Sequence, residues 1–465
     1  MTSYKEELEE QQRWKLKPEY IGATIFDNML AEEFMSPDDI SDGQNYALEK
    51  VISYATKYVP YYTNLFEKLK LSANAITSID DLQLLPVLTK EEVLEKEQLL
   101  HTTSLPAGES IFGYFSTSGT TGRRVRVLMT KNSNLMFSFL TIRQHRWCRF
   151  DPLKTLAYIR ARVTILGHGI KKSPKDTTTF SQKYWNYAGQ FFKTGNSIAM
   201  SHTTTLEDQV QWMQENNPAY LISYPSMLEE YAFARNDGPP VDSIEAVMGI
   251  SAQMTTGMRT KIEKSYGIPV HQCYGLNEIG LVATRCEAGR YHVHAQHCIV
   301  EIVDEDGLHC QPGETGRIVI TGLNNLAMPL IRYDTDDTAV ATDDSCPCGR
   351  TLPSFGEVTG RYRRWRGLPE GSREKHAVIR KAFESLPNNI LINIRRFQVH
   401  QYETNVFELR IVSKVSLNKD LVSWIMKQWH SEYGDSDNSL YITQVDEILP
   451  GRGGKLNEFT SDFFS

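Results

Sequence analysis

Hydroxyl and glycine residues are concentrated between Ser116 and Gly122, where the chain reads Ser-Thr-Ser-Gly-Thr-Thr-Gly. Glycine lets backbone N–H groups approach phosphate oxygens closely, and serine and threonine hydroxyls supply further donors. Two cations, Arg123 and Arg124, follow the run. The spacing differs from that of a Walker A loop, GxxxxGK[ST]. The segment therefore predicts a phosphate-binding loop of another kind, and an exposed polar turn is the alternative.

Four later segments also carry residues suited to nucleotide chemistry. They are 274–278 (Tyr-Gly-Leu-Asn-Glu), 332–337 (Arg-Tyr-Asp-Thr-Asp-Asp), Gly360-Arg361, and 449–455, which begins Leu-Pro and ends Gly-Lys. Together with residues 118–122, these segments resemble, in the same order, the signature motifs of the adenylate-forming superfamily. The phenylacetate–CoA ligase branch is indicated by residues 61–63, 84–90 and 346–350. The resemblance covers nearly the whole chain.

The resemblance implies ATP-dependent activation of a carboxylic acid. The carboxylate attacks the α-phosphorus of ATP, an acyl-AMP and pyrophosphate form, and a nucleophile then displaces AMP. Catalysis of such a step consists mainly of positioning and of neutralising spreading negative charge. Arg123 stands where the family usually has lysine, which keeps the charge but changes its geometry. The resemblance assigns the phosphates to Ser118, Gly119, Thr120, Thr121, Gly122 and Arg123.

The second and third motifs are implied to hold a metal ion and the ribose. We expect Glu278 to coordinate Mg²⁺, a cation that prefers carboxylate and phosphate oxygens. We expect Asp337 to accept hydrogen bonds from both ribose hydroxyls, although Asp336 replaces the family's glycine. The alternatives are a loop carboxylate for Glu278 and a turn residue for Asp337. The other expected nucleotide-binding residues are Tyr274, Gly275, Asn277 and Arg361. The alternative for Tyr274 is a core tyrosine, and the alternative for Arg361 is a charge in a solvated basic run.

Lys455 follows the glycine-rich run Gly451-Arg452-Gly453-Gly454. The resemblance makes it the catalytic lysine, which bridges the carboxylate and the α-phosphate during adenylation. An ordinary surface lysine is the alternative. Because this lysine belongs to the C-terminal region, we expect a small domain to close over the large one during the cycle.

The acyl pocket is expected at Tyr224, Ser251 and Ala252, which stand in segments that match pocket-lining positions of the superfamily. Strand residues of this kind are often core residues, which is the alternative. Residues 160–172 gather three further cations and a histidine around Arg160, and they suit a polar or anionic substrate or the phosphates of CoA. A solvated loop is the alternative for that stretch.

CoA is the leading acceptor of the acyl group, and an aryl or arylacetic acid is the leading substrate. Residues 362–367 depart from the pattern of the branch, so an amine acceptor, which gives an amide, is the alternative. A catalytically silent binding homologue is a third hypothesis. The presence of Glu278, Asp337 and Lys455 argues against that third hypothesis.

Cys346 and Cys348 form a CxC pair, and Cys286 and His292 lie upstream. A structural Zn²⁺ site needs about four sulfur or nitrogen ligands. In some relatives a structural zinc is bound at positions matching these four residues, so the resemblance implies the same here. Reduced thiols without a metal are the alternative. The remaining thiols to which we assign a packing role are Cys148, Cys273 and Cys310.

The composition of the 465 residues is that of a globular protein, with 40% hydrophobic and 23% charged residues and a formal charge of −7. The mild acidity disfavours a dedicated nucleic-acid binder. Seven cysteines do not make a disulfide scaffold in so long a chain, which favours a reducing cytoplasm. The charged start and the lack of an apolar run of about 18 residues predict neither a signal peptide nor a membrane span. The sequence leaves open whether the protein forms a homodimer.

Strand and helix patterns alternate and predict an α/β fold. We expect a large multi-layer N-terminal domain over residues 1–359 and a small, mobile α+β C-terminal domain over 360–465. Helices are predicted over 47–62, 89–100 (with a capping box from Thr89 to Glu92), 206–216, 226–235, 374–385 and 421–433. Strands are predicted over 125–129, 219–223, 246–250, 298–303, 316–321, 338–341, 395–402, 407–413 and 441–445.

Overall fold

The computed structural model describes residues 22–116, 124–160, 178–234, 238–343, 345–361, 393–433, 439–448 and 458–463, together with separate residues between 378 and 390. The first described element, α2 (Gly22–Ala31), leads through the short 3₁₀ helix η1 (Glu32–Phe34) into α3 (Pro37–Tyr58) and α4 (Pro60–Leu69). Ser36 caps α3 by accepting a hydrogen bond from the N–H of Asp39. Because Val59 is extended and Pro60 starts a new helix, the helix predicted over 47–62 is divided in two.

Most of the chain is built around one twelve-stranded sheet, with the order β11-β12-β13-β14-β10-β9-β8-β7-β6-β3-β5-β4. Strands β5, β3, β6, β7 and β8 are parallel neighbours, and the pairs from β8 through β14 to β11 are antiparallel. The bounds are β3 (Leu156–Arg160), β4 (Thr179–Gln182), β5 (Ser197–Ser201), β6 (Tyr220–Ser223), β7 (Ala246–Gly249), β8 (Val270–Leu276), β9 (Gly280–Arg285), β10 (Tyr291–Val293), β11 (Cys298–Val303), β12 (Thr315–Gly322), β13 (Tyr333–Ala341) and β14 (Ser354–Arg361).

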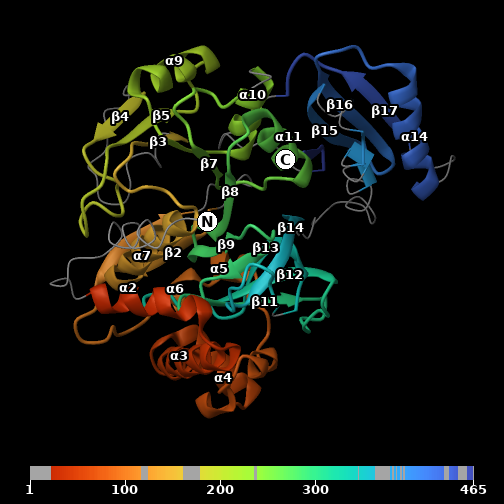
Figure 1. Cartoon of the computed structure of the whole chain (residues 1–465). Helices are drawn as coiled ribbons and strands as arrows, with labels where there is room; N and C mark the ends of the chain where they lie inside the picture. The colour runs from red at the N-terminus through yellow and green to blue at the C-terminus, as the bar shows by residue number, and fades with distance from the viewer. Residues whose placement is uncertain are drawn as a thin grey trace.

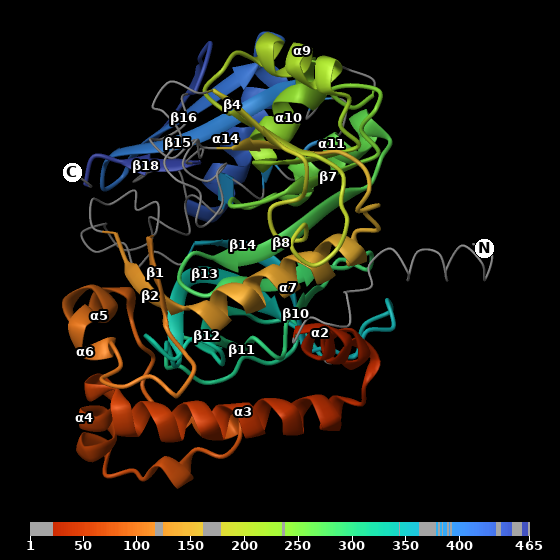
Figure 2. The same cartoon turned by 90° about the vertical axis from the view of Figure 1, so that its left-hand side faces the viewer.

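Helices cover both faces of the parallel part of this sheet. They are α7 (Lys131–Trp147) on one side, and α10 (Pro225–Ala234) and α11 (Thr256–Tyr266) on the other, with α9 (Leu206–Asn216) beside them (Figure 2). Alternate residues of β3 face the two layers. Leu156 and Tyr158 belong to the core with α7, whereas Ala157 and Ile159 belong to the core with α10 and α11. The result is the layered α/β arrangement that the sequence predicts.

A separate hairpin, β1 (Ile111–Ser116) and β2 (Arg126–Thr130), flanks the segment predicted to bind phosphate. Upstream, α5 (Lys90–Glu95) and α6 (Glu97–Leu100) divide the helix predicted over 89–100, because Lys96 leaves helical geometry. The capping box between Thr89 and Glu92 is present as predicted. The strand predicted over 338–341 starts earlier, at Tyr333, so most of the segment at 332–337 lies on a strand.

The C-terminal part forms its own four-stranded sheet, with the order β17-β16-β15-β18. The strands are β15 (Ile394–Glu403), β16 (Val406–Ser413), β17 (Ser439–Gln444) and β18 (Phe459–Ser461), and α14 (Lys419–Tyr433) packs on them. Figure 1 shows this sheet, in blue, beside α10 and α11 of the large sheet. In the described part of the chain, no helix has the length and apolarity needed to cross a membrane.

Candidate active site

The carboxyl ends of the parallel strands meet at one edge of the sheet, which is where α/β folds bind ligands. Strand β8 brings Tyr274 and Gly275 to this edge. A side chain at Gly275 would place its Cβ only 2.7 Å from the carbonyl oxygen of Gly280 on β9. The tight approach of β8 and β9 therefore requires glycine at this position, and it brings the following residues into the site.

Tyr274 connects two of the segments that the sequence analysis singled out. Its hydroxyl donates a hydrogen bond to Asp337 Oδ2 at 2.9 Å and lies 3.2 Å from Thr335 Oγ1. Burial raises the pKa of Tyr274, and the negative charge of Asp337 raises it further. The hydroxyl therefore stays protonated and holds one carboxylate oxygen of Asp337 in place. Tyr274 is also buried. The interpretation as a core tyrosine and the interpretation as a site residue are therefore compatible.

Glu278 is buried and lies beside Tyr333 of β13, whose hydroxyl donates to Glu278 Oε1 at 3.1 Å. Burial and the nearby Glu278 carboxylate raise the pKa of Tyr333, which keeps that donor protonated. A buried carboxylate at the ligand-binding edge of a sheet has the oxygen chemistry that suits Mg²⁺. The sequence pattern did not identify Tyr333 as the residue that fixes this carboxylate.

Asn277 ties this edge to the segment predicted to bind phosphate. Its amide donates a hydrogen bond of 2.8 Å to the carbonyl oxygen of Ser116, the first residue of that segment and the only one of its residues 116–122 that the structure describes. The backbone of Arg361 pairs with Asp337 across β13 and β14. The structure therefore brings Tyr274, Asn277, Asp337 and the backbone of Arg361 to one region. Ser118, Gly119, Thr120, Thr121, Gly122, Arg123 and Lys455 lie outside the described residues, as does the Arg361 side chain.

Asp336 stands where the sequence resemblance implies glycine, and its backbone φ of +61° lies in the region that favours glycine. Few side chains tolerate this left-handed conformation, although aspartate does so more readily than most. Burial raises the pKa of Asp336 to about 6, while Lys90, whose Nζ lies 3.7 Å from the carboxylate, opposes the rise. The contact with Lys90 was not predicted, because the two residues are far apart in the sequence.

The three residues expected to line the acyl pocket differ in exposure. Tyr224 is buried where β6 ends and α10 begins, whereas Ser251 is exposed and has a φ of +64°. Ala252 is half-buried. These residues follow the neighbouring strands β6 and β7, so the topology places them at the same edge as Tyr274.

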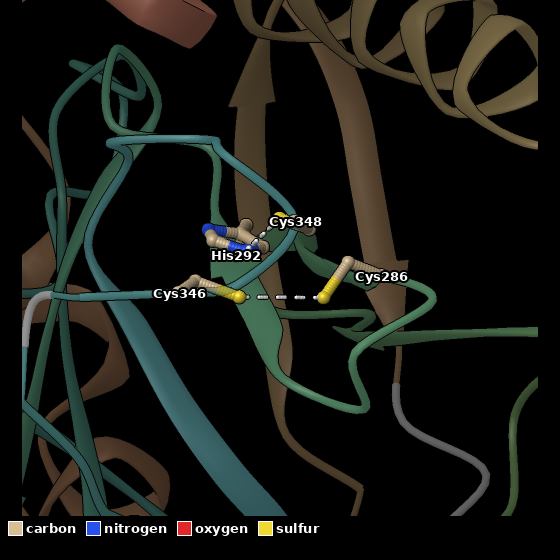
Figure 3. A group of neighbouring side chains, drawn as sticks. All are labelled: Cys286, His292, Cys346 and Cys348. Atoms are coloured by element: carbon tan, nitrogen blue, oxygen red, sulfur yellow. Dashed lines mark hydrogen bonds between the residues drawn. The ribbon is translucent and has the colours of Figure 1, made fainter.

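The four expected zinc ligands converge in space (Figure 3). The Sγ atoms of Cys286, Cys346 and Cys348 and a ring nitrogen of His292 all lie within 4.8 Å of one another. Cys348 Sγ lies 3.2 Å from His292 Nε2, and Cys286 Sγ lies 3.7 Å from Cys346 Sγ. The Nδ1 atom of His292 lies 3.0 Å from the carbonyl oxygen of Leu352, which fixes the ring with Nε2 facing the thiols. This donor set and its spacing fit a tetrahedral Zn²⁺.

Residues 59–328 match the family described as AMP-binding enzyme, which is more than half of the chain. This chain belongs to that family. The match agrees with the site geometry, because the strand ends that carry Tyr274 and Asn277 lie within the matched residues. It also confirms the predicted relationship to the adenylate-forming superfamily.

Curated relatives indicate the branch. The chain is 28% identical to the phenylacetate–coenzyme A ligase of Thermus thermophilus over 68% of this chain and 69% of that protein. It is 25% identical to the enzyme of the same name from Escherichia coli, over 71% of this chain and 72% of that protein. A crystal structure of 2-hydroxyisobutyryl-CoA ligase, in complex with its acyl-AMP, has a TM-score of 0.73 at 16% identity and covers 93% of this chain and 92% of that one. The fold class and the relationship to phenylacetate–CoA ligases are thus confirmed.

Proposed function

We propose that this protein is an ATP-dependent acid–CoA ligase that forms an acyl-AMP intermediate. The observation that carries the proposal is the convergence of Asp337, Glu278 and Asn277 on one sheet edge, each held by a hydrogen bond to another residue of the site region. Membership of the AMP-binding enzyme family supports the use of ATP. The similarity to phenylacetate–CoA ligases supports an aryl or arylacetic acid and CoA as the co-substrates.

In the proposed first step, a carboxylate oxygen of the acid attacks the α-phosphorus and the bond to pyrophosphate breaks. Asp337 would bind the ribose through the carboxylate that Tyr274 orients. Residues 118–123 would bind the β- and γ-phosphates, and Arg361 would add a contact to the nucleotide. Lys455 would neutralise charge between the acid and the α-phosphate. In the second step the CoA sulfur attacks the acyl carbon, gives up its proton and displaces AMP.

The metal ions and the domain division are part of the same proposal. Glu278 would hold Mg²⁺, which supplies charge neutralisation for the phosphates when bound. Cys286, His292, Cys346 and Cys348 would hold a structural Zn²⁺ with no open position for catalysis. We also propose that the boundary lies between residues 359 and 360, and that the C-terminal domain moves to deliver Lys455. Tyr224, Ser251 and Ala252 would line the acyl pocket.

The experiment that tests this function measures pyrophosphate release with ATP, Mg²⁺ and a panel of carboxylic acids. CoA or simple amines are then added, and the products are identified by mass spectrometry. We expect acid-dependent release and a thioester with CoA. Release followed by an amide would instead identify an amine as the acceptor, and no release with any acid would refute the proposal. Lys455→Ala should lose pyrophosphate release while retaining ATP binding, and unchanged turnover would refute the role of Lys455.

A further inference from the structure

Arg160 is the last residue of β3, and it faces a part of the sheet edge that the proposed chemistry does not use. Its register partner on β5 is Ser201, and the preceding residue, Ile159, pairs with Ser223 on β6. Arg160 continues the alternation of Leu156 and Tyr158, which point into the core with α7. The arginine is half-buried, and it stands one strand away from Tyr224, the buried residue of the expected acyl pocket.

The side chain of Arg160 has no partner of opposite charge in the described part of the chain. Its Nε is buried without a hydrogen-bond acceptor, and no ion pair with a described carboxylate is found. A half-buried charge that has no partner of opposite sign within the protein is available to a ligand.

His202 adds a second polar group beside Arg160. Its backbone N–H donates to the carbonyl oxygen of Arg160 at 3.0 Å, and its ring meets the ring of Tyr224 edge-on, with centroids 5.7 Å apart. The Nδ1 atom of His202 is also buried without a hydrogen-bond partner among the described residues. The His202 ring therefore lies next to Tyr224 with one nitrogen unpaired among the described residues, one position beyond the register partner of Arg160.

The charge of Arg160 affects the pKa of two side chains on the α7 side of the sheet. Burial raises the pKa of Tyr187, and the positive charge of Arg160 offsets part of that rise. Burial likewise raises the pKa of Cys273 on β8 to about 11, again with an opposing contribution from Arg160. The guanidinium thus lies within electrostatic reach of residues from β8 and from the segment before β5. This position is enclosed by the α7 layer and adjoins the strand ends at which the acid would be activated.

We propose that Arg160 binds a second anionic group of the acid substrate, so that the preferred substrate is a dicarboxylic acid or another acid with a second negative charge. The inference rests on the proposed function, because it concerns the acid that this function activates. A guanidinium binds a carboxylate through two parallel N–H···O bonds. The reacting carboxylate would then lie towards Tyr274, with the second charge towards Arg160.

The test compares acids that differ only by the second carboxylate, such as phenylacetate with 4-carboxyphenylacetate and benzoate with terephthalate. We expect kcat/KM for pyrophosphate release to be at least about 10-fold higher for the dianionic member, as a charged hydrogen bond predicts. Arg160→Gln should remove that preference and change turnover of the monoanionic acid by less than about 3-fold, and Arg160→Lys should restore part of the preference. Arg146→Gln, which alters a half-buried arginine of α7, is the matched control.

Binding supplies a measurement that does not depend on turnover. 4-Carboxyphenylacetate should raise the melting temperature of the wild-type protein more than phenylacetate does, and Arg160→Gln should abolish the difference. Equal kcat/KM and equal thermal shifts for the two acids would overturn the inference while leaving the proposed function intact. An equal loss with both acids in Arg160→Gln would assign a purely structural role and also overturn it. Selective binding without pyrophosphate release from any acid would support the inference and refute the proposed function.

Discussion

Charged residues on the two faces of the parallel sheet differ in whether the chain pairs them. On the α10 side, Glu230 binds two arginines of the C-terminal sheet, with 2.9 Å from Oε2 to Arg395 Nε and 2.5 Å from Oε1 to Arg396 Nη2. The neighbouring Glu229 binds Lys261 at 2.9 Å. On the α7 side, Arg160 has no such partner among the described residues. The protein thus pairs one set of charges internally and leaves the other open.

The difference indicates what each set does. Glu230 connects α10 of the large sheet with β15 of the small one, so its ion pairs hold the two sheets together. Lys261 contributes to the same contact by donating to the carbonyl oxygen of Ile394 at 2.9 Å. A charge that is fully paired within the chain stabilises structure, whereas an unpaired charge at a ligand-binding edge is available to a ligand. Substitutions in the two sets should therefore have opposite effects on stability.

The largest loss of stability is expected at the Cys/His cluster, where four side chains converge from segments far apart in the sequence. Cys286→Ser removes one of four converging ligands, and we expect the zinc content to fall well below half an equivalent. The free energy of unfolding should fall by about 4 kcal/mol or more. Metal analysis and urea denaturation measure the two effects. Cys310→Ser, at a thiol outside the cluster, is the control. A wild-type protein with less than half an equivalent of zinc would contradict the assignment.

Glu230→Ala should give the next largest effect, because it leaves two arginines without their partner. We expect the first unfolding transition in urea to lose about 2 kcal/mol. Glu245→Ala is the matched control, since its pair with Lys154 is exposed, and it should cost less than about 1 kcal/mol. Equal losses in the two variants would show that the buried ion pairs do not stabilise the contact between the sheets.

Arg160→Leu should leave stability unchanged or raise it by up to about 1 kcal/mol in the absence of substrate. The reason is that this substitution removes a half-buried charge and breaks no ion pair with a described residue. Urea denaturation beside Glu230→Ala measures the contrast directly. A loss close to that of Glu230→Ala would mean that Arg160 is paired after all, and the comparison of the two sets would fail.

Asp336→Asn should produce the smallest change, and the change should depend on pH. The folded-state pKa of about 6 is higher than the usual value of 3.8, so the folded protein favours the protonated form. Stability therefore decreases as the pH rises from about 4 to about 6, and the deficit persists above that range. The variant should gain up to about 1 kcal/mol at pH 7.5, allowing for partial exposure, and less at pH 5. The same gain in Asp306→Asn, at an exposed turn, would argue against this explanation.

The sequence predicted the parts of the fold that depend on local pattern. The helix over 206–216 and the strand over 298–303 have the predicted bounds, and the fold class and family relationship are confirmed. Helix breaks were missed where the decision rests on one residue. At Val59 and Lys96 the backbone leaves helical geometry within otherwise continuous patterns. Periodicity averages over several residues and does not register such single-residue breaks.

In the candidate site, the sequence predicted the residues that stand in short signature motifs but not the contacts between them. Tyr274, Asn277, Glu278 and Asp337 were found because they stand in short signature segments. The contacts that orient or oppose them were not predicted, because Tyr333, Lys90 and Ser116 stand in other signature segments and meet these residues only in the folded chain. Arg160 was noticed within a run of cations, but its lack of a described partner is a property of the packing. Long-range contacts of this kind leave no signal in a single sequence.

The most direct test of the central claim is acid-dependent exchange of radiolabelled pyrophosphate into ATP, which reports reversible formation of an acyl-AMP. The wild-type protein should catalyse this exchange with Mg²⁺ and an accepted acid. Glu278→Gln should reduce it by roughly 100-fold or more, because a charge that acts on the transferring phosphate is lost. Both proteins should have the same thermal stability within about 1 kcal/mol. Exchange at the wild-type rate in Glu278→Gln, or no exchange with any acid, would contradict the account.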